Sequence, residues 1–307
     1  MAYVLIAEDL TKHYGNVRAL TNFNITVDPG SIYGILGPNG SGKTTCLSII
    51  LDVIKADSGS YEWFGKTASH HTRRRRIGAL LETPNFYPYL TAVENLKVVA
   101  AIKNRGDKNI HAALQVTDLS SRRNSRYSTF SLGMKQRLAI AATLVGNPEA
   151  LVLDEPTNGL DPQGIAEIRA LIREIASEGK TIIIASHLLD EVEKICTHVA
   201  ILKSGEKVTS GKVADILGKD NQVEVAAENM EALEAAAKEM QGLQSCKKER
   251  DKLTLKFSHT VHTGEMNAYF FDKGITLTHL NTRRRSLENI FLELTSSNEQ
   301  AATDRVH

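Results

Sequence analysis

The sequence predicts an α/β fold with a largely parallel sheet, followed by a second, small α+β domain. Three observations support this fold class. The β-rich run 31–36 leads into the glycine-rich segment Gly37–Thr45, GPNGSGKTT, and a helical-looking apolar run follows it. The runs 150–154 and 181–186 are solidly apolar, and an amphipathic segment joins them as in a βαβ unit. Beyond Gly218 the composition shifts to Ala- and Glu-rich and alternating segments.

The first domain is expected to span residues 1–218. Its N-terminal part, residues 3–36, contains short strand-like runs with turn signals at 13–16 and 28–30, which predicts an antiparallel β-region. Further strands are expected at 60–64 and 77–81.

A helical subdomain is expected at about 84–148. Its candidate helices lie at 91–103, 109–116 and 131–145. Another helix is predicted at 162–177, because this amphipathic segment begins with a proline and ends before Gly179.

The second domain is expected at 219–297, with a helix at 226–240, a strand at 253–257 and a helix at 286–294. Residues 298–307 are polar and are predicted to form a disordered tail. This domain shows no catalytic constellation, so a packing or dimer-stabilising role and a regulatory role are both open.

Composition narrows the class of protein. A length of 307 residues suits about two domains. The charges of the 37 basic and 36 acidic residues nearly cancel, so the net charge of the chain does not favour binding to nucleic acid or to an anionic membrane. Cys46, Cys196 and Cys246 are odd in number and far apart, which predicts inert thiols in a reducing compartment. The opening MAYVLIAEDL resembles a first strand rather than a signal peptide, and no run reaches the ~20 apolar residues of a membrane helix.

The segment Gly37–Thr45 has the spacing of a phosphate-binding loop. Its glycines allow the backbone to form a nest whose N–H groups point at phosphate oxygens, and the following helix adds the positive end of its dipole. Lys43 can reach the β- and γ-phosphates, and the Thr44 hydroxyl can bind Mg²⁺. The predicted nucleotide-binding residues of this loop are Gly37, Pro38, Asn39, Gly40, Ser41, Gly42, Lys43, Thr44 and Thr45.

Asp154 and Glu155 stand where an apolar strand ends, which is where parallel α/β sheets bind ligands. Asp154 suits a Mg²⁺ ligand acting through water, and Glu155 suits a base that positions water. The alternative is that the acidic pair only caps the strand or is solvated. His187 follows the next apolar strand and could contact a γ-phosphate, or it could cap the next helix.

Between the loop and the acidic pair lies the segment 130–137, FSLGMKQR, which resembles the signature sequence of ATP-binding cassette proteins, the ABC ATPases. Ser131 and Gly133 match the serine and second glycine of the signature, while Leu132 replaces its first glycine and Met134 its glutamine. The resemblance implies that this serine and helix N-terminus close on the γ-phosphate of ATP held by a second subunit. The alternative is a helix-capping serine with no ligand.

Other motifs follow in the order of the family. Tyr14 matches the aromatic residue that stacks on adenine, and Asn158–Asp161 matches the loop that joins two nucleotide sites. The resemblance covers about residues 3–217. It implies a P-loop NTPase fold with a RecA-like core, an antiparallel β-subdomain and an α-helical subdomain, and it implies ATP and Mg²⁺ as cofactors. Glu155, His187 and Lys43 are then the expected catalytic residues, with Mg²⁺ held by Thr44, Glu82 and Asp154.

Glu82 departs from the family pattern, which usually has a glutamine after this strand. The segment Glu82–Pro88 is similar to bacterial ABC exporters that confer bacitracin or lantibiotic resistance. A carboxylate there can bind Mg²⁺ but repels the γ-phosphate. We expect Glu82 to couple hydrolysis to transport, the alternative being a solvated loop glutamate.

Two basic runs, His70–Arg76 and Arg283–Arg285, have no interleaved aromatic residues. A solvated face is the expected interpretation, ahead of nucleic-acid binding or contact with lipid headgroups or an acidic loop of a partner.

The resemblance implies the ATP-binding and ATP-hydrolysing subunit of an ABC exporter. Such a subunit works as a homodimer or as one of a pair of nucleotide-binding subunits, beneath integral membrane permease subunits, without nucleic acid. It is then cytoplasmic and peripheral on the inner face of the cell membrane. The alternatives are a soluble ABC ATPase acting on nucleic acid or ribosomes, and a small-molecule kinase that uses the same loop.

Overall fold

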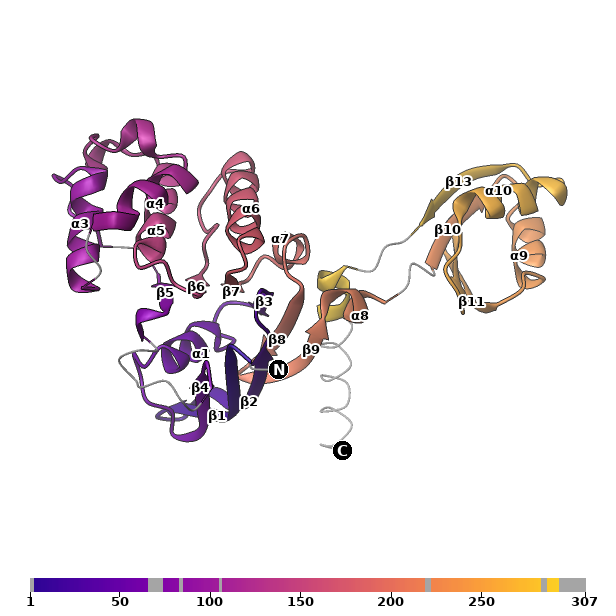
Figure 1. The fold of residues 1–307 in the computed structure, drawn as a ribbon. Coiled ribbons are helices and arrows are strands. Elements are labelled where there is room, and N and C mark those ends of the chain that lie inside the picture. The colour runs from indigo at the N-terminus through magenta and orange to yellow at the C-terminus, as the bar shows by residue number, and fades with distance from the viewer. Residues whose placement is uncertain are drawn as a thin grey trace. The chain divides into compact units, whose positions relative to one another are not determined.

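The computed structural model describes residues 3–65, 74–82, 85–104, 107–218, 222–282 and 286–292. They form two compact units that divide after Val213, and Figure 1 shows their elements. The expected disordered tail at 298–307, residues 70–73 of the first basic run and the run 283–285 lie outside the described residues.

The first unit is built on a six-stranded sheet in the order β5–β6–β7–β3–β8–β9. Neighbouring strands from β5 to β8 run parallel, and β9 returns antiparallel to β8. Every residue of β3, β6 and β7 is buried, because both faces of the sheet are covered. The strands are β3 Ile32–Leu36, β5 Ile77–Leu80, β6 Ala150–Asp154, β7 Thr181–Ser186, β8 His198–Lys203 and β9 Glu206–Lys212.

Three helices follow strands of this sheet: α1 Lys43–Ile50, α6 Pro162–Ser177 and α7 Leu189–Glu193. The predicted bounds of α6 are confirmed, since Asp161 caps the helix and proline occupies its first turn. Helix α1 shares one hydrophobic core with the central sheet and with an antiparallel sheet, through residues that include Leu47, Phe23 and Val152.

The antiparallel sheet has the order β2–β1–β4, with β1 Leu5–Tyr14, β2 Val17–Val27 and β4 Ser58–Trp63. The prediction of short strands at 3–36 is wrong for β1 and β2, which are 10 and 11 residues long. Register shifts interrupt the pairing along β1, so polar residues break the alternation without ending the strand.

A helical region lies between β5 and β6, drawn in purple and magenta in Figure 1. Helix α3 begins after Thr91 with a capping box completed by Glu94, and Ser131 caps α5. The predicted helices agree with α3 Ala92–Ile102, α4 Ile110–Val116 and α5 Leu132–Leu144, and short 3₁₀ turns lie at Asp107–Asn109, Ser120–Arg122 and Tyr127–Thr129.

The second unit holds an antiparallel sheet in the order β11–β12–β10–β13, and the helices 230–238 and 263–272 pack on it. The core between them contains Val225, Leu255 and Phe270. The elements are α8 Val213–Leu217, which lies at the division between the units, β10 Gln222–Ala227, α9 Met230–Lys238, β11 Leu243–Glu249, β12 Lys252–Phe257, α10 Thr263–Asp272 and β13 Leu277–Thr282.

The predicted helix 226–240 begins too early. Ala226 and Ala227 belong to β10, where Ala226 pairs with His279. Pairing on both sides of β10 outweighs the helix propensity of alanine, and α9 starts only after Asn229, whose side chain accepts the Ala232 N–H.

In the part of the chain that the structure describes, no helix is long and apolar enough to cross a membrane. The same residues contain no cluster of three or more His, Cys, Asp or Glu side chains arranged to hold a metal ion by themselves. Cys46 and Cys196 are buried, and burial raises the pKa of both thiols, which favours their protonated form.

Candidate functional site

The glycine-rich loop lies between β3 and α1 and turns directly into the helix. Gly42, the residue before α1, has φ +105°, and a Cβ there would stand 2.3 Å from the Ala19 carbonyl oxygen. At Gly37 a Cβ would stand 2.2 Å from the Leu202 carbonyl oxygen. Neighbouring backbone therefore encloses the loop, and glycine is required at these two positions.

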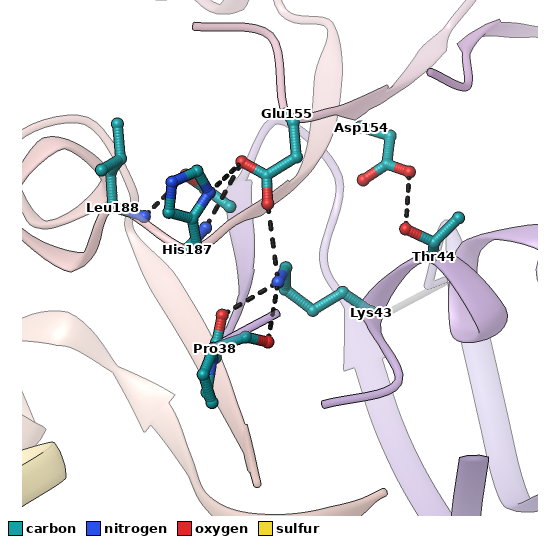
Figure 2. A network of polar contacts seen from close by, with 9 residues as sticks. Pro38, Lys43, Thr44, Asp154, Glu155, His187 and Leu188 are labelled. Carbon is teal, nitrogen blue, oxygen red and sulfur yellow. Dashed lines mark hydrogen bonds and ion pairs between the residues drawn. The ribbon is translucent and has the colours of Figure 1, made fainter. Parts of the chain in front are cut away.

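Lys43 brings a buried cation to this loop. It is 5% exposed, and its Nζ donates to the carbonyl oxygens of Gly37 at 2.9 Å and Pro38 at 3.2 Å. The same nitrogen lies 3.5 Å from Oε1 of Glu155, as Figure 2 shows. The ammonium group thus bridges the loop and the end of β6, where an anion bound to the loop would meet it.

Asp154 ends β6 and accepts a hydrogen bond from the Thr44 hydroxyl at 2.9 Å (Figure 2). The residue is 4% exposed, and its Oδ1 atom has no hydrogen-bond partner among the described residues. Burial, together with the charges of Glu155 and Glu82, raises the pKa of this carboxyl. An unpartnered buried carboxylate oxygen beside a hydroxyl fits the oxygen ligands that Mg²⁺ prefers.

Glu155 is held in place from β7. Its N–H donates to the Ala185 carbonyl, and its Oε2 lies 2.8 Å from Nδ1 of His187 and accepts the His187 N–H at 3.4 Å. The backbone of Glu155 has φ +47°, a conformation that glutamate rarely adopts and that the surrounding contacts maintain. The structure therefore fixes this carboxylate between a lysine and a histidine.

His187 does not cap the next helix. Helix α7 begins at Leu189 with Leu188 as its N-cap and without a side-chain cap, and the Leu188 N–H donates instead to Oγ of Ser186 at 3.1 Å. The hydrogen bond of His187 to Glu155 favours a role in the site over the helix-capping alternative.

Other predicted site residues stand apart from this cluster. Tyr14 ends β1 and is 50% exposed, with Nζ of Lys12 at 5.7 Å from the centre of its ring. Glu82 is exposed, follows β5 and has φ +55°. Its charge helps to raise the pKa of Asp154, after burial and Glu155, which places it within electrostatic reach of the cluster.

Ser131 and Gly133 lie at the start of α5. Ser131 accepts the Met134 N–H at 3.3 Å and is exposed, so it caps the helix and still faces outward. A Cβ on Gly133 would meet nothing within 4 Å. Beside them, Leu132 is 53% exposed, and its Cδ2 would lie 3.4 Å from a Cβ on Gly159.

Two residues that support the site were not predicted. Ser186 orients the chain after His187 through the Leu188 N–H, and its carbonyl accepts the Gly37 N–H at 3.4 Å. Asp57 accepts from Nζ of Lys12 and from the His13 N–H, both at 2.7 Å, and so holds the strand end that carries Tyr14. The position of Ser186 beside His187 was a usable signal, whereas Asp57 is 44 residues from His13 in the chain.

Comparison with known proteins agrees with this site. The sequence model described as "ABC transporter" matches residues 20–158. The chain is 38% identical over 300 residues to the bacitracin transport ATP-binding protein BcrA of Bacillus licheniformis, covering 96% of this chain and 98% of BcrA. It is 39% identical over 203 residues to the lantibiotic transport ATP-binding protein SrtF of Streptococcus pyogenes, covering 66% of this chain and 88% of SrtF.

Among solved structures, one similar chain is the ATP-binding cassette MJ0796, in a dimeric, post-hydrolysis state bound to ADP and Pi. The TM-score is 0.60 at 28% identity, over 68% of this chain and 99% of the other. These similarities confirm the predicted family, cassette fold and ATPase activity. The chain belongs to the ATP-binding proteins of the ABC transporter family and is an ATPase of that family.

Proposed function

We propose that the chain powers an ABC exporter by ATP-driven closure of two ATP-binding subunits, followed by hydrolysis that reopens them. The observation that carries this proposal is the cluster at the end of the parallel strands, where Lys43 meets Glu155 and Thr44 meets Asp154. Carboxyl ends of parallel strands are the usual ligand edge of an α/β sheet.

Each residue of the cluster then has a chemical role. The loop 37–45 and Lys43 hold the β- and γ-phosphates, which compete with Glu155 and two backbone carbonyls for the lysine. Thr44 and Asp154 are positioned to hold Mg²⁺, which supplies charge neutralisation when it is bound. Glu155 accepts a proton from the attacking water, and His187 holds Glu155 in position and faces the γ-phosphate.

A second ATP-binding subunit completes the site in this proposal. Ser131 is exposed at a helix N-terminus, and the backbone at Gly133 is unobstructed, so both suit the γ-phosphate of ATP held by the other subunit. The dimeric cassette among the similar structures supports pairing. Tyr14, with its ring half exposed, is proposed to stack on adenine.

Membrane permease subunits would receive the resulting motion, with the chain peripheral on the cytoplasmic face of the membrane. The relatives named above are transport ATP-binding proteins, which favours export of this kind over the alternative of a nucleic-acid or ribosome ATPase. We also propose that the ATP-binding domain spans residues 1–218 and that a small C-terminal domain spans residues 219–297.

The Glu155→Gln variant tests the assignment of the base. Loss of the carboxylate should lower steady-state ATP hydrolysis by ~10²-fold or more, and the variant should form an ATP-bound dimer on size-exclusion chromatography. Glu149→Gln is the matched control, because Glu149 lies just before the same strand and pairs with Arg76 outside the cluster. Normal turnover by Glu155→Gln would refute the assignment, and hydrolysis that requires a phosphoryl acceptor would favour a kinase.

We also propose that Glu82 couples hydrolysis to transport and contributes to the Mg²⁺ site. Its charge acts on Asp154, although the side chain is exposed. Glu82→Gln should preserve basal ATPase and alter its stimulation by the permease subunits, while Glu82→Ala should reduce both. If neither variant changes transport-coupled ATPase, Glu82 is a solvated loop residue.

A further inference from the structure

A buried amide lies in the helical region, away from the catalytic cluster. Asn95 on α3 is 1% exposed, and its Oδ1 accepts the Tyr87 N–H at 2.8 Å. Its Nδ2 donates to the carbonyl oxygens of Tyr87 at 3.1 Å and Thr91 at 3.0 Å, with Leu90 at 3.4 Å. The Asn95 amide thus pairs with both the N–H and the carbonyl of Tyr87, as the backbone of a neighbouring strand would. These hydrogen bonds fix the conformation of the loop 85–91.

This loop is bonded in turn to the segment 123–130, which ends immediately before Ser131. The carbonyl of Leu90 accepts the Tyr127 N–H at 2.9 Å, and the carbonyl of Pro88 accepts the Ser128 N–H at 3.0 Å. The start of α3 continues the same contact, because the Ala92 N–H donates to the Ser125 carbonyl at 3.2 Å. Loop 85–91 therefore forms one side of the support on which the segment 123–130 rests.

Aromatic rings fill the junction between the two segments. Phe86 and Tyr127 meet edge to face with centroids 5.2 Å apart, and Tyr127 contacts Phe130 at 6.1 Å. Phe130 is 5% exposed and is the residue before the serine that caps α5. Lys135, one turn into α5, places its Nζ 5.3 Å from the centre of the Tyr127 ring. The position of Ser131 thus depends on contacts that run back to the loop held by Asn95.

We infer that Asn95 is a positioning residue for Ser131. Its amide keeps loop 85–91 in the shape that supports the segment 123–130, and this support presents the Ser131 hydroxyl and the α5 N-terminus to the ATP of a second subunit. This inference rests on the proposed pairing of two ATP-binding subunits.

The test uses the full-length Glu155→Gln chain as the parent and measures two affinities. One is the affinity for a fluorescent ADP analogue bound by the protein's own loop 37–45. The other is the ATP-dependent dimerisation constant from analytical ultracentrifugation. Addition of Asn95→Ala should leave the first within about twofold and weaken the second by about tenfold or more, a change that corresponds to an altered interface rather than a lost nucleotide site.

Two further variants separate positioning from general loss of stability. Phe86→Leu removes the ring contact with Tyr127 and leaves the buried amide intact, so it should weaken dimerisation in the same direction. Thr143→Val is the matched control, because Thr143 is a buried polar residue of α5 whose hydroxyl donates to Ile140 and takes no part in the junction. It should dimerise as the parent does.

Dimerisation of Asn95→Ala equal to that of the parent would overturn the inference, as would an equal loss in Thr143→Val. An Asn95→Ala chain that also loses the ADP analogue would have a general folding defect, and this result would likewise count against a positioning role. If the parent itself fails to dimerise with ATP, the proposed function fails and the inference falls with it.

Discussion

Replacement of Asp154 by asparagine is expected to stabilise the nucleotide-free chain while it impairs ATP hydrolysis. Burial, reinforced by the charge of Glu155, raises the pKa of Asp154, so the folded chain binds this proton more tightly than the unfolded chain. Ionisation of the carboxyl therefore opposes folding. The free energy of unfolding falls as the pH rises from the ordinary pKa of the carboxyl to its raised pKa in the folded chain. Above the raised pKa, the full destabilisation caused by the buried charge is present.

The size of the gain follows from the contacts of the carboxylate. Oδ2 accepts from Thr44 at 2.9 Å, a hydrogen bond that the carbonyl oxygen of asparagine can keep. Oδ1 has no partner among the described residues, so the substitution breaks no hydrogen bond there. Removal of the charge without loss of a hydrogen bond should yield about 1 kcal/mol near neutral pH, which is a rise of about 2–4 °C in Tm for a unit of this size.

Trp63, the single tryptophan of the chain, offers the assay. It is 2% exposed, and its Nε1 donates to the Ile50 carbonyl at 2.7 Å, so its fluorescence reports unfolding of the unit that holds the site. Thermal unfolding is followed as the pH is lowered from 8, and the advantage of Asp154→Asn should shrink as the pH falls through the raised pKa toward the ordinary one. Addition of Mg²⁺ and ATP should stabilise the wild type more than the variant.

Asp57→Asn is the control of opposite sign. The hydrogen bond from Lys12, followed by that from the His13 backbone, lowers the pKa of Asp57. The ionised form thus favours folding above its ordinary pKa, and the variant should lose stability at neutral pH. An Asp154→Asn chain that is less stable than the wild type at pH 7–8 would show that the hydrogen bond outweighs desolvation, and would refute the reasoning.

Two further predictions concern the loop and the signature helix. Ser131→Asp should keep Tm within about 1 °C, because aspartate caps helices as well as serine does. The negative charge of the aspartate should nevertheless abolish the ATP-dependent dimer of the Glu155→Gln chain. Retention of that dimer would assign Ser131 to capping alone. Gly42→Ala should cost more than about 2 kcal/mol and eliminate nucleotide binding, since a Cβ would meet the Ala19 carbonyl at φ +105°. Gly133→Ala, with open space around it, is the stability control, and equal unfolding temperatures for the two alanine variants would contradict the steric argument.

The sequence was most informative where burial is complete. Strands β6 and β7 and helix α6 have the predicted bounds, because covered parallel strands are continuous apolar runs and the helix has both a proline start and a clear amphipathic face. Asp154, Glu155 and His187 could be placed at one edge of the sheet for the same reason, since Asp154 ends β6 and the other two residues directly follow β6 and β7.

Prediction was weaker where one face of a sheet is polar or where contacts are distant in the chain. Strands β11 and β13 were missed, because exposed or partly exposed residues such as Lys247 and Asn281 obscure the alternation that marks a strand. The contact of Lys43 with Glu155 joins positions more than a hundred residues apart, so the sequence could nominate both residues but not their 3.5 Å approach. Asn95 was overlooked because an asparagine inside a helix gives no local sign of what it bonds.

The backbone conformation of Gly159 bears on how such chains can diverge. Leu132 stands where the family signature has glycine, and its side chain reaches to 3.4 Å from the position that a Cβ on Gly159 would take. Gly159 has φ +76°, so any residue with a side chain there would be strained, whereas its Cβ would make only an ordinary van der Waals contact with the leucine. The backbone conformation, rather than the leucine, therefore keeps residue 159 as glycine. Residue 132 can then change in size without a matching change at residue 159, so the signature helix and the neighbouring loop can diverge independently at this pair.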